Sequence, residues 1–155
     1  MAPITTNKHN APRSLVDFAK KPHYFRGDSD YTVTQLIDSP RVRILRDWHS
    51  DEIEDDVYEN IFRLVGTAIH SIVEDSSDSA KHWHPKATSV KEERIFVERE
   101  RAKISGAIDI QYRNEDGTLT IGDYKFTSTH SLRFPEKWEK QLNLYAWLLR
   151  QNDVT

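Results

Sequence analysis

The sequence predicts a mixed α/β protein in the broad sense, more specifically an α+β fold. Helices come first along the chain, then strands, and a helix is at the end. Three observations predict this order. Between Asp55 and Asp75, apolar residues recur at the spacing of one helical face. Residues 90–126 contain three strand-like segments, and residues 135–151 return to helical spacing.

Length and composition predict a single folded domain. The chain has 155 residues, of which 37% are hydrophobic, and it contains six Phe, six Tyr and four Trp. So many aromatic residues are typical of a chain with a packed core. No apolar run approaches the roughly 20 residues of a membrane span, and the N-terminus has no signal-peptide pattern. The predicted location is therefore the cytoplasm, or the host cytoplasm if the protein is viral.

Charge and cysteine content exclude several kinds of site. The formal net charge is -3 and the isoelectric point is near 6.2, so a nucleic-acid partner would have to meet a local basic patch. The chain has no cysteine. Disulfides, thiolate nucleophiles, zinc fingers and iron–sulfur clusters are thereby excluded. Any metal chemistry must use carboxylates and imidazoles.

The chain is predicted to begin with a flexible arm, residues 1–30, and to continue as the folded domain, residues 31–155. The arm is rich in Pro, Asn, Asp, Lys and His and contains only a short apolar cluster. Residues 31–48 predict short helices that break at an internal proline, with Thr34 or Asp38 as N-caps.

The long helix predicted at residues 55–75 is defined by one apolar stripe: Val57, Ile61, Leu64, Val65, Ala68 and Ile72. His70 lies on the flank roughly opposite the centre of this stripe, so by itself it predicts a solvated histidine. Residues 75–89 form a loop by composition. The two histidines in that loop, His82 and His84, are interpreted as incidental rather than metal-binding.

The strands on either side of the turn NEDG, residues 114–117, allow two registers. A two-residue turn would put Asp109 opposite Tyr124. A three-residue loop that ends at Gly117 would put Asp109 opposite Asp123 instead. The choice matters because a shift of one residue sends every side chain to the other face of the sheet.

In the second register, Asp109, Asp123 and Lys125 share one face. Two carboxylates opposite each other, with Cβ atoms about 5 Å apart, destabilise a sheet. A divalent cation between them reverses that effect, and Mg²⁺ suits such a site because it binds carboxylate oxygens and retains exchangeable waters. By itself, however, an Asp and a Lys two residues apart are more often a solvated surface pair.

Three stretches, GAIDI, GDYK and QLNLYA, resemble motifs of the PD-(D/E)XK nuclease superfamily, and in particular of its RecB-like branch. The resemblance covers residues 31–151 and depends on the order and spacing of the motifs together. It implies a restriction-endonuclease-like core, a mixed central sheet flanked by helices. Relatives usually continue with another strand after the last helix, so the resemblance also implies a minimal member or one truncated at the C-terminus.

The resemblance further implies a Mg²⁺ or Mn²⁺ site whose ligands are His70, Asp109, Asp123 and the backbone carbonyl of Tyr124. It assigns Lys125 to positioning the attacking water or stabilising charge on the phosphate. It also calls for a glutamate on the preceding strand, where Glu93 is favoured over Glu98. Ser39 stands where some members carry the first cysteine of an iron–sulfur cluster, so no such cluster is expected.

The last predicted helix carries the implied DNA contacts. Gln141 and Tyr145 are four residues apart and share a helical face, which in the resemblance borders the active site. A small basic and aromatic patch for a nucleic-acid strand would consist of Lys137, Lys140, Arg133 and Trp138. Taken alone, such residues are more often a solvated helix face.

The resemblance therefore implies a metal-dependent DNA nuclease, most readily an exonuclease of recombination, repair or phage DNA metabolism. Its partner would be single- or double-stranded DNA, and a homo-oligomer or a partner protein remains open. The alternative is a catalytically silent nuclease-fold module that binds nucleic acid or a protein. A third alternative, an unrelated α+β domain, would require Asp109 and Asp123 to lie on opposite faces.

Overall fold

The computed structural model describes residues 4–20, 27–75, 88–125 and 134–153. The chain divides into two compact units. Unit 1 comprises Met1–Phe25 and Asp38–Ala68, and unit 2 comprises Arg26–Ile37 and Ile69–Thr155. Within the described ranges, no helix is both long enough and apolar enough to cross a membrane.

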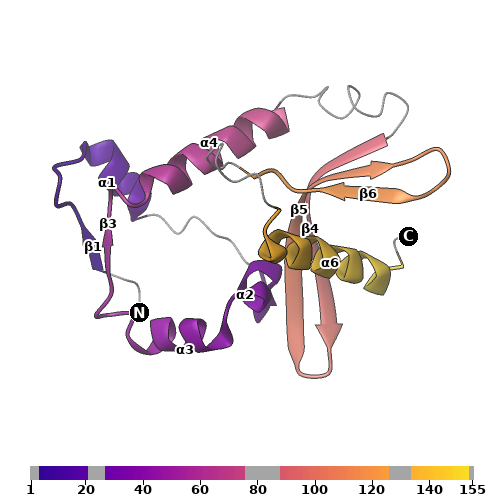
Figure 1. The fold of residues 1–155 in the computed structure, drawn as a ribbon, viewed down its shortest axis with the longest axis horizontal. Coiled ribbons are helices and arrows are strands. Elements are labelled where there is room, and N and C mark those ends of the chain that lie inside the picture. Colours follow the sequence, from indigo (N-terminus) through magenta and orange to yellow (C-terminus); the bar gives the residue numbers. More distant parts are fainter. Residues whose placement is uncertain (1–3, 21–26, 76–87, 126–133, 154–155) are drawn as a thin grey trace. The chain divides into compact units, whose positions relative to one another are not determined.

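Unit 1 contains a two-stranded parallel sheet (Figure 1). In it, β1 (Ile4–Thr6) pairs with β3 (Glu54–Asp56). The helix α1 (Arg13–Ala19) follows β1, and α3 (Pro40–Trp48) precedes β3. β1 and α1 both lie in the stretch predicted to be a flexible arm, so that stretch contains a paired strand and a helix. The domain boundary at residue 30 stays a prediction.

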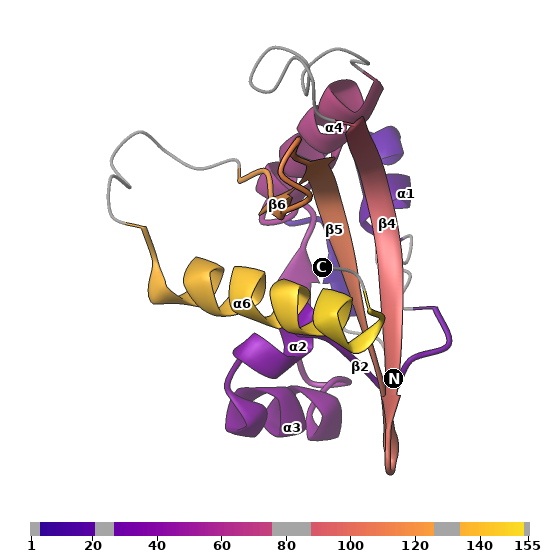
Figure 2. The same cartoon turned by 90° about the vertical axis from the view of Figure 1, so that its right-hand side faces the viewer.

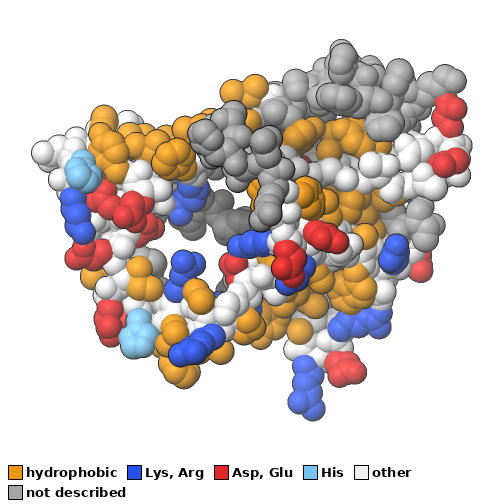
Figure 3. Space-filling view, viewed as in Figure 1, with side chains coloured by type: hydrophobic (Ala, Val, Ile, Leu, Met, Phe, Trp, Pro, Cys, Tyr) orange, Lys and Arg blue, Asp and Glu red, His pale blue; other side chains and the backbone are white. Residues whose placement is uncertain are grey.

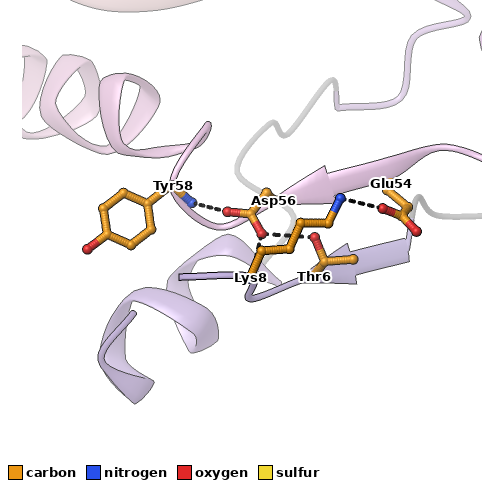
Figure 4. A network of polar contacts seen from close by, with 5 residues as sticks. All are labelled: Thr6, Lys8, Glu54, Asp56 and Tyr58. Atoms are coloured by element: carbon orange, nitrogen blue, oxygen red, sulfur yellow. Dashed lines mark hydrogen bonds and ion pairs between the residues drawn. The ribbon is translucent and has the colours of Figure 1, made fainter. Parts of the chain in front are cut away.

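A network around Asp56 joins the two strands of unit 1 (Figure 4). One carboxylate oxygen of Asp56 accepts hydrogen bonds from the Thr6 hydroxyl at 2.9 Å and from the Lys8 backbone N–H at 2.9 Å. The other oxygen accepts from the Tyr58 backbone N–H at 3.0 Å. The N–H groups of Lys8 and Tyr58 hold the pKa of Asp56 below its ordinary value. Lys8 also pairs with Glu54 at 2.6 Å.

The long helix α4 (Ile61–Asp75) begins later than predicted. The predicted start at Asp55 is wrong because that residue belongs to β3, and Asp56 is held in the strand-end network. The chain then turns, and Asn60 bonds back to the Asp56 carbonyl through its side chain at 3.1 Å. Asn60 also accepts the first helical hydrogen bond, from Leu64 at 2.9 Å.

The two short helices after residue 31 are capped differently from the prediction. α2 (Val33–Ile37) follows Thr32, whose hydroxyl accepts the Gln35 N–H at 3.3 Å while the Gln35 side chain accepts the Thr32 N–H at 3.0 Å. This reciprocal pair is a capping box. Thr34 lies inside α2, and Ser39 occupies the N-cap of α3, so both predicted caps, Thr34 and Asp38, are wrong.

The helix α3 packs little of its surface in unit 1. It has no buried residue, and its exposed apolar side chains are Val42, Ile44, Leu45 and Trp48. Hydrophobic side chains are visible on the surface over α3, with Lys and Arg side chains beside them (Figure 3). The helix begins with Pro40, which is favourable at that position because a first-turn N–H has no helical partner.

Unit 2 contains a mixed sheet flanked by helices, as predicted (Figures 1 and 2). β5 (Ala102–Arg113) is its central strand and pairs antiparallel with β4 (Thr88–Arg99). On its other side, β5 pairs in parallel with β2 (Tyr31–Thr32) and antiparallel with β6 (Leu119–Gly122). The last helix, α6 (Glu136–Gln151), crosses this sheet and begins directly after Pro135.

The hairpin between β5 and β6 has the three-residue loop. Ile110 pairs with Gly122, and Asn114 donates its N–H to the Thr118 carbonyl at 2.8 Å. Gly117 closes the loop with a φ of 84°, a backbone conformation that costs glycine little. Continuing the register by one pair sets Asp109 opposite Asp123. The three-residue alternative is confirmed, and the two-residue turn is excluded.

The core of unit 2 lies between α6 and the sheet. It contains Val33, Ile95, Val97, Ile108, Tyr145, Leu148 and Leu149. Gly106 on β5 lets α6 approach, because a Cβ atom at this position would lie 2.8 Å from both Leu148 and Tyr145. Real Cβ atoms are essentially never that close to a neighbour, so with a larger residue here the Leu148 and Tyr145 side chains, or the helix that carries them, would have to shift.

Candidate functional site

Two carboxylates face each other where the β5–β6 pairing ends. Asp109 lies within β5, and Asp123 follows the last residue of β6. The Tyr124 backbone N–H donates to an oxygen of Asp109 at 2.7 Å, which ties the chain after β6 to the central strand. Both carboxylates are largely shielded from water, with side chains 13% and 9% exposed.

The surroundings of Asp109 disfavour its negative charge. Burial raises the pKa of Asp109 above its ordinary value, and the N–H of Tyr124 works in the opposite direction. The neighbouring charge of Asp123 raises the pKa further. This is the electrostatic result expected when two carboxylates are forced together in a partly dry site.

Lys125 and His70 bring positive or polarisable groups to the two carboxylates. The ammonium of Lys125 lies 2.5 Å from an oxygen of Asp123. Nδ1 of His70, on α4, lies 3.7 Å from an oxygen of Asp109, and its ring meets the edge of Tyr124 at a centroid distance of 6.3 Å. The structure therefore brings His70 to the carboxylates, although its helical position alone predicted only a solvated histidine.

Gln141 on α6 holds the second carboxylate in place. Its Nε2 donates to an oxygen of Asp123 at 2.9 Å and to the hydroxyl of Tyr145 at 2.8 Å. Gln141 is 5% exposed and Tyr145 4% exposed, so this network lies inside the packed helix–sheet interface. Through Gln141, the core residue Tyr145 is linked to Asp123 of the carboxylate pair.

In a comparison with protein-family models, residues 34–155 match the model of the PD-(D/E)XK nuclease superfamily. The chain belongs to the PD-(D/E)XK nuclease superfamily. Proteins of this superfamily are generally nucleases, so the match supports a nucleic-acid substrate and hydrolytic chemistry. Searches of curated protein sequences and of solved structures return no match. The family match, together with the register of Asp109 and Asp123, excludes the alternative of an unrelated α+β domain.

The candidate donor residues suit a hard divalent ion in their chemistry. Within the described part of the chain, no three His, Cys, Asp or Glu side chains converge closely enough to hold an ion. Asp109, Asp123 and His70 nevertheless offer the oxygen and nitrogen donors that Mg²⁺ and Mn²⁺ accept. A cation would also supply the positive charge that the raised pKa of Asp109 indicates is lacking.

The two candidate glutamates of β4 lie differently. Glu93 pairs with Ile108 in the sheet, and its carboxylate accepts the side-chain N–H of Gln111 at 2.8 Å. Glu98 pairs with Lys103, toward the far end of the hairpin from Asp109. Of the two, Glu93 lies nearer to Asp109 along the hairpin, although its pairing with Ile108 leaves it one residue out of register with Asp109.

Sequence reasoning missed one strand position. Lys91 pairs with Ile110 and Glu93 with Ile108, so the backbone register sets position 92 opposite Asp109. The register follows from a two-residue turn at Glu100-Arg101, because Arg99 pairs with Ala102. Applying the same register calculation to this second hairpin would have found position 92.

The remaining predicted contacts are only partly described. Lys137 is exposed in the first turn of α6, and Trp138 is half-buried beside it. Arg133, His82 and His84 lie outside the described residues, so their predicted roles are not assessed. Tyr124 is placed next to Asp109 by its N–H, and metal binding by its carbonyl stays a prediction.

Proposed function

We propose that this protein is a metal-dependent deoxyribonuclease of the RecB-like branch, acting most readily as an exonuclease. The single observation that best supports this is the opposed pair Asp109 and Asp123, with the Lys125 ammonium on Asp123. Two like charges in register destabilise a sheet, so a purely structural role gives no reason for them. A site that binds a cation and a phosphate gives such a reason.

The proposed ion is Mg²⁺ or Mn²⁺, held by Asp109 and Asp123, with His70 and the Tyr124 carbonyl as further donors. When bound, the ion would polarise the scissile phosphate and lower the pKa of a bound water. Lys125 is placed beside the same carboxylate, so its ammonium can stabilise negative charge that develops on the phosphate.

Gln141 and Tyr145 act as positioning residues in this proposal. The Gln141 amide fixes one oxygen of Asp123, and the Tyr145 hydroxyl holds the amide. Partners that orient metal-binding carboxylates have effects of about 10–100-fold on affinity or activity. Arg133 and Lys137 are proposed to contact the DNA backbone.

On β4, the proposal assigns the site glutamate to Glu93. Its carboxylate accepts the Gln111 N–H at 2.8 Å, and Gln111 lies two residues from Asp109 on β5. The variants Glu93→Gln and Glu92→Gln separate this assignment from the register-matched position 92. A larger loss of cleavage in Glu92→Gln would move the assignment to that residue.

A second candidate function has its own supporting observation. The Lys125 ammonium already neutralises part of the Asp123 charge, and no three metal-binding side chains converge in the described residues. Both features suit a catalytically silent module that binds nucleic acid or a partner protein. The two candidates differ in whether adding a divalent ion produces cleavage.

The test is cleavage of end-labelled single- and double-stranded DNA, and of RNA, with Mg²⁺ or Mn²⁺ and with EDTA. We expect metal-dependent products from the wild type, released progressively from one end. Asp123→Asn and Lys125→Ala should each abolish them, because one removes a ligand and the other removes the ammonium.

Matched controls are Glu139→Gln, an exposed carboxylate on α6, and Lys20→Ala, an exposed residue next to α1. Both should cleave at the wild-type rate. A wild type that melts cooperatively yet leaves every substrate intact with either metal would overturn the enzyme proposal in favour of the silent module. Products that appear first in the interior of the substrate would overturn the exonuclease assignment alone.

A further inference from the structure

An aromatic pair lies at the N-terminal end of α6. Phe134 precedes the helix and is 63% exposed. Its ring meets the Trp138 ring edge to face, with centroids 5.8 Å apart and planes at 83°. Trp138 is half-buried and contacts Phe134 from the helix, while most of the Phe134 side chain is exposed to water.

This pair is continuous with the carboxylate site. Trp138 and Gln141 are three residues apart on α6, so they are neighbours on successive turns, about 5 Å apart along the helix axis. Gln141 in turn donates to Asp123 at 2.9 Å. The aromatic surface therefore starts one helical turn from a residue that touches the proposed metal-binding carboxylate.

The charge around the pair indicates how it would bind a ligand. The first turns of α6 carry two acidic and two basic residues, Glu136, Lys137, Glu139 and Lys140. One acid and one base among them, Glu136 and Lys140, form an ion pair at 2.7 Å. With the charges balanced, phosphate attraction alone does not favour a ligand here. The exposed ring of Phe134 remains as the feature that a ligand can use.

The ligand that suits such rings beside a phosphodiesterase site is a nucleobase. Base–aromatic stacking contributes about 1–3 kcal/mol per base and works with every base, because each presents a flat π face. In an intact duplex that face is covered by neighbouring base pairs. Only an unpaired or terminal base can offer it to a protein side chain.

We propose that Phe134, supported by Trp138, stacks on an unpaired base close to the scissile phosphate, so that the substrate class is a single strand or a frayed end. This inference rests on the proposed function, because the base is that of the strand being cleaved. Phe134 is a specificity-determining residue in this role, and it does not touch the reacting atoms.

The first experiment measures binding without cleavage. A single-stranded DNA oligonucleotide with a terminal 2-aminopurine is titrated with protein in EDTA, and quenching of the probe reports stacking. We expect the wild type to quench and Phe134→Ala to bind about 5–150-fold more weakly, the range that 1–3 kcal/mol of stacking gives. Phe134→Trp should restore binding, because it restores a ring.

The matched control is Phe62→Ala, which removes another highly exposed phenylalanine on a different helix. It should bind like the wild type. In cleavage assays with metal, Phe134→Ala should raise KM on single strands and leave kcat nearly unchanged. An abasic site at the end nucleotide should weaken the wild type but have no further effect on Phe134→Ala.

The two proposals fail in different ways. Cleavage that is metal-dependent yet identical in wild type and Phe134→Ala, with and without the abasic site, overturns the stacking role and keeps the nuclease. Quenching that depends on Phe134 in a protein that never cleaves overturns the nuclease and keeps the stacking role. A change of oligomeric state in Phe134→Ala, with unchanged DNA binding, overturns the stacking role in favour of a protein contact.

Discussion

Asp56 ends the short strand β3 of unit 1, and Asp109 lies in the long central strand β5 of unit 2. Both aspartates are shielded from water, but their surroundings are opposite. Both oxygens of Asp56 accept hydrogen bonds, two of them from backbone N–H groups, and its pKa is lowered. Asp109 accepts one backbone N–H and faces the carboxylate of Asp123, and its pKa is raised. The surroundings of Asp56 favour its negative charge, and those of Asp109 on balance disfavour it.

The difference shows how to separate a structural carboxylate from a candidate functional one. Burial alone does not distinguish them, since both are shielded from water. What distinguishes them is whether the protein itself supplies the partners that an anion needs. The N–H and hydroxyl donors around Asp56 stabilise its charge, whereas the burial of Asp109 and its carboxylate neighbour outweigh the Tyr124 N–H and the nearby His70 and Lys125.

The largest expected effect is on catalysis. Asp109→Asn and Asp123→Asn should each reduce DNA cleavage by more than the roughly 100-fold that loss of a supporting partner costs, because each removes a proposed metal donor and its charge. Asp56→Asn should leave kcat of the folded protein unchanged. Single-turnover cleavage rates, corrected for the folded fraction, measure both. Equal losses of cleavage rate in Asp56→Asn and Asp109→Asn would contradict the distinction between a structural Asp56 and a functional Asp109.

The second-largest expected effect on cleavage concerns Gln141, which donates a hydrogen bond to Asp123. Gln141→Ala removes the amide that donates to this carboxylate, and we expect cleavage to fall about 10–100-fold. Asn143→Ala, an exposed amide on the same helix, is the control and should have no effect. Titrating Mn²⁺ against cleavage rate should show weaker metal activation in Gln141→Ala. A variant with normal metal activation would show that Asp123 does not need the amide.

A smaller effect is expected on stability from Asp56. Both oxygens of Asp56 face donors, so in Asp56→Asn the new NH₂ must meet an N–H or a hydroxyl, and the melting temperature should fall by several degrees. The lowered pKa means that this stabilisation is present above the unfolded value of about 3.9 and is lost as pH falls through the folded value. The wild-type advantage should therefore disappear in acid. Melting curves from neutral to acidic pH test this.

The smallest expected effect is a rise in melting temperature, in Asp109→Asn. Asp109 uses only one oxygen to accept an N–H, so an amide can keep that bond, and Asp109→Asn should melt slightly higher than wild type in EDTA at neutral pH. Because the folded pKa is raised, wild type loses stability as pH rises from the unfolded value through the folded one. The gain of the variant should vanish below pH 4 and reverse when Mn²⁺ is added. A lower melting point in EDTA at neutral pH would contradict this interpretation of Asp109.

Local rules in the sequence predicted much of unit 2. The register of the β5–β6 hairpin follows from one glycine with positive φ, and it determines that Asp109 faces Asp123. The helical spacing of Gln141 and Tyr145 likewise predicts that they meet, and they do at 2.8 Å. Such features depend on a few neighbouring residues, so the sequence contains all the information they need.

Contacts between distant segments were not predictable in the same way. β1 and β3 have three residues each and pair across about fifty positions, as Ile4 with Glu54, and strands so short carry no periodicity. Because β3 takes up Glu54–Asp56, α4 begins at Ile61 and not at the predicted Asp55. The contact of His70 with Asp109 was implied by family resemblance and not by helical spacing, because it depends on tertiary packing.

The close approach at Gly106 has a consequence for how this protein tolerates change. The Tyr145 ring that fills the space above Gly106 also carries the hydroxyl that holds Gln141. A substitution that moves α6 by the width of one methyl group would thus be transmitted to Asp123. Variants of this core selected only for thermal stability are therefore expected to lose metal response first, while their melting curves still look normal.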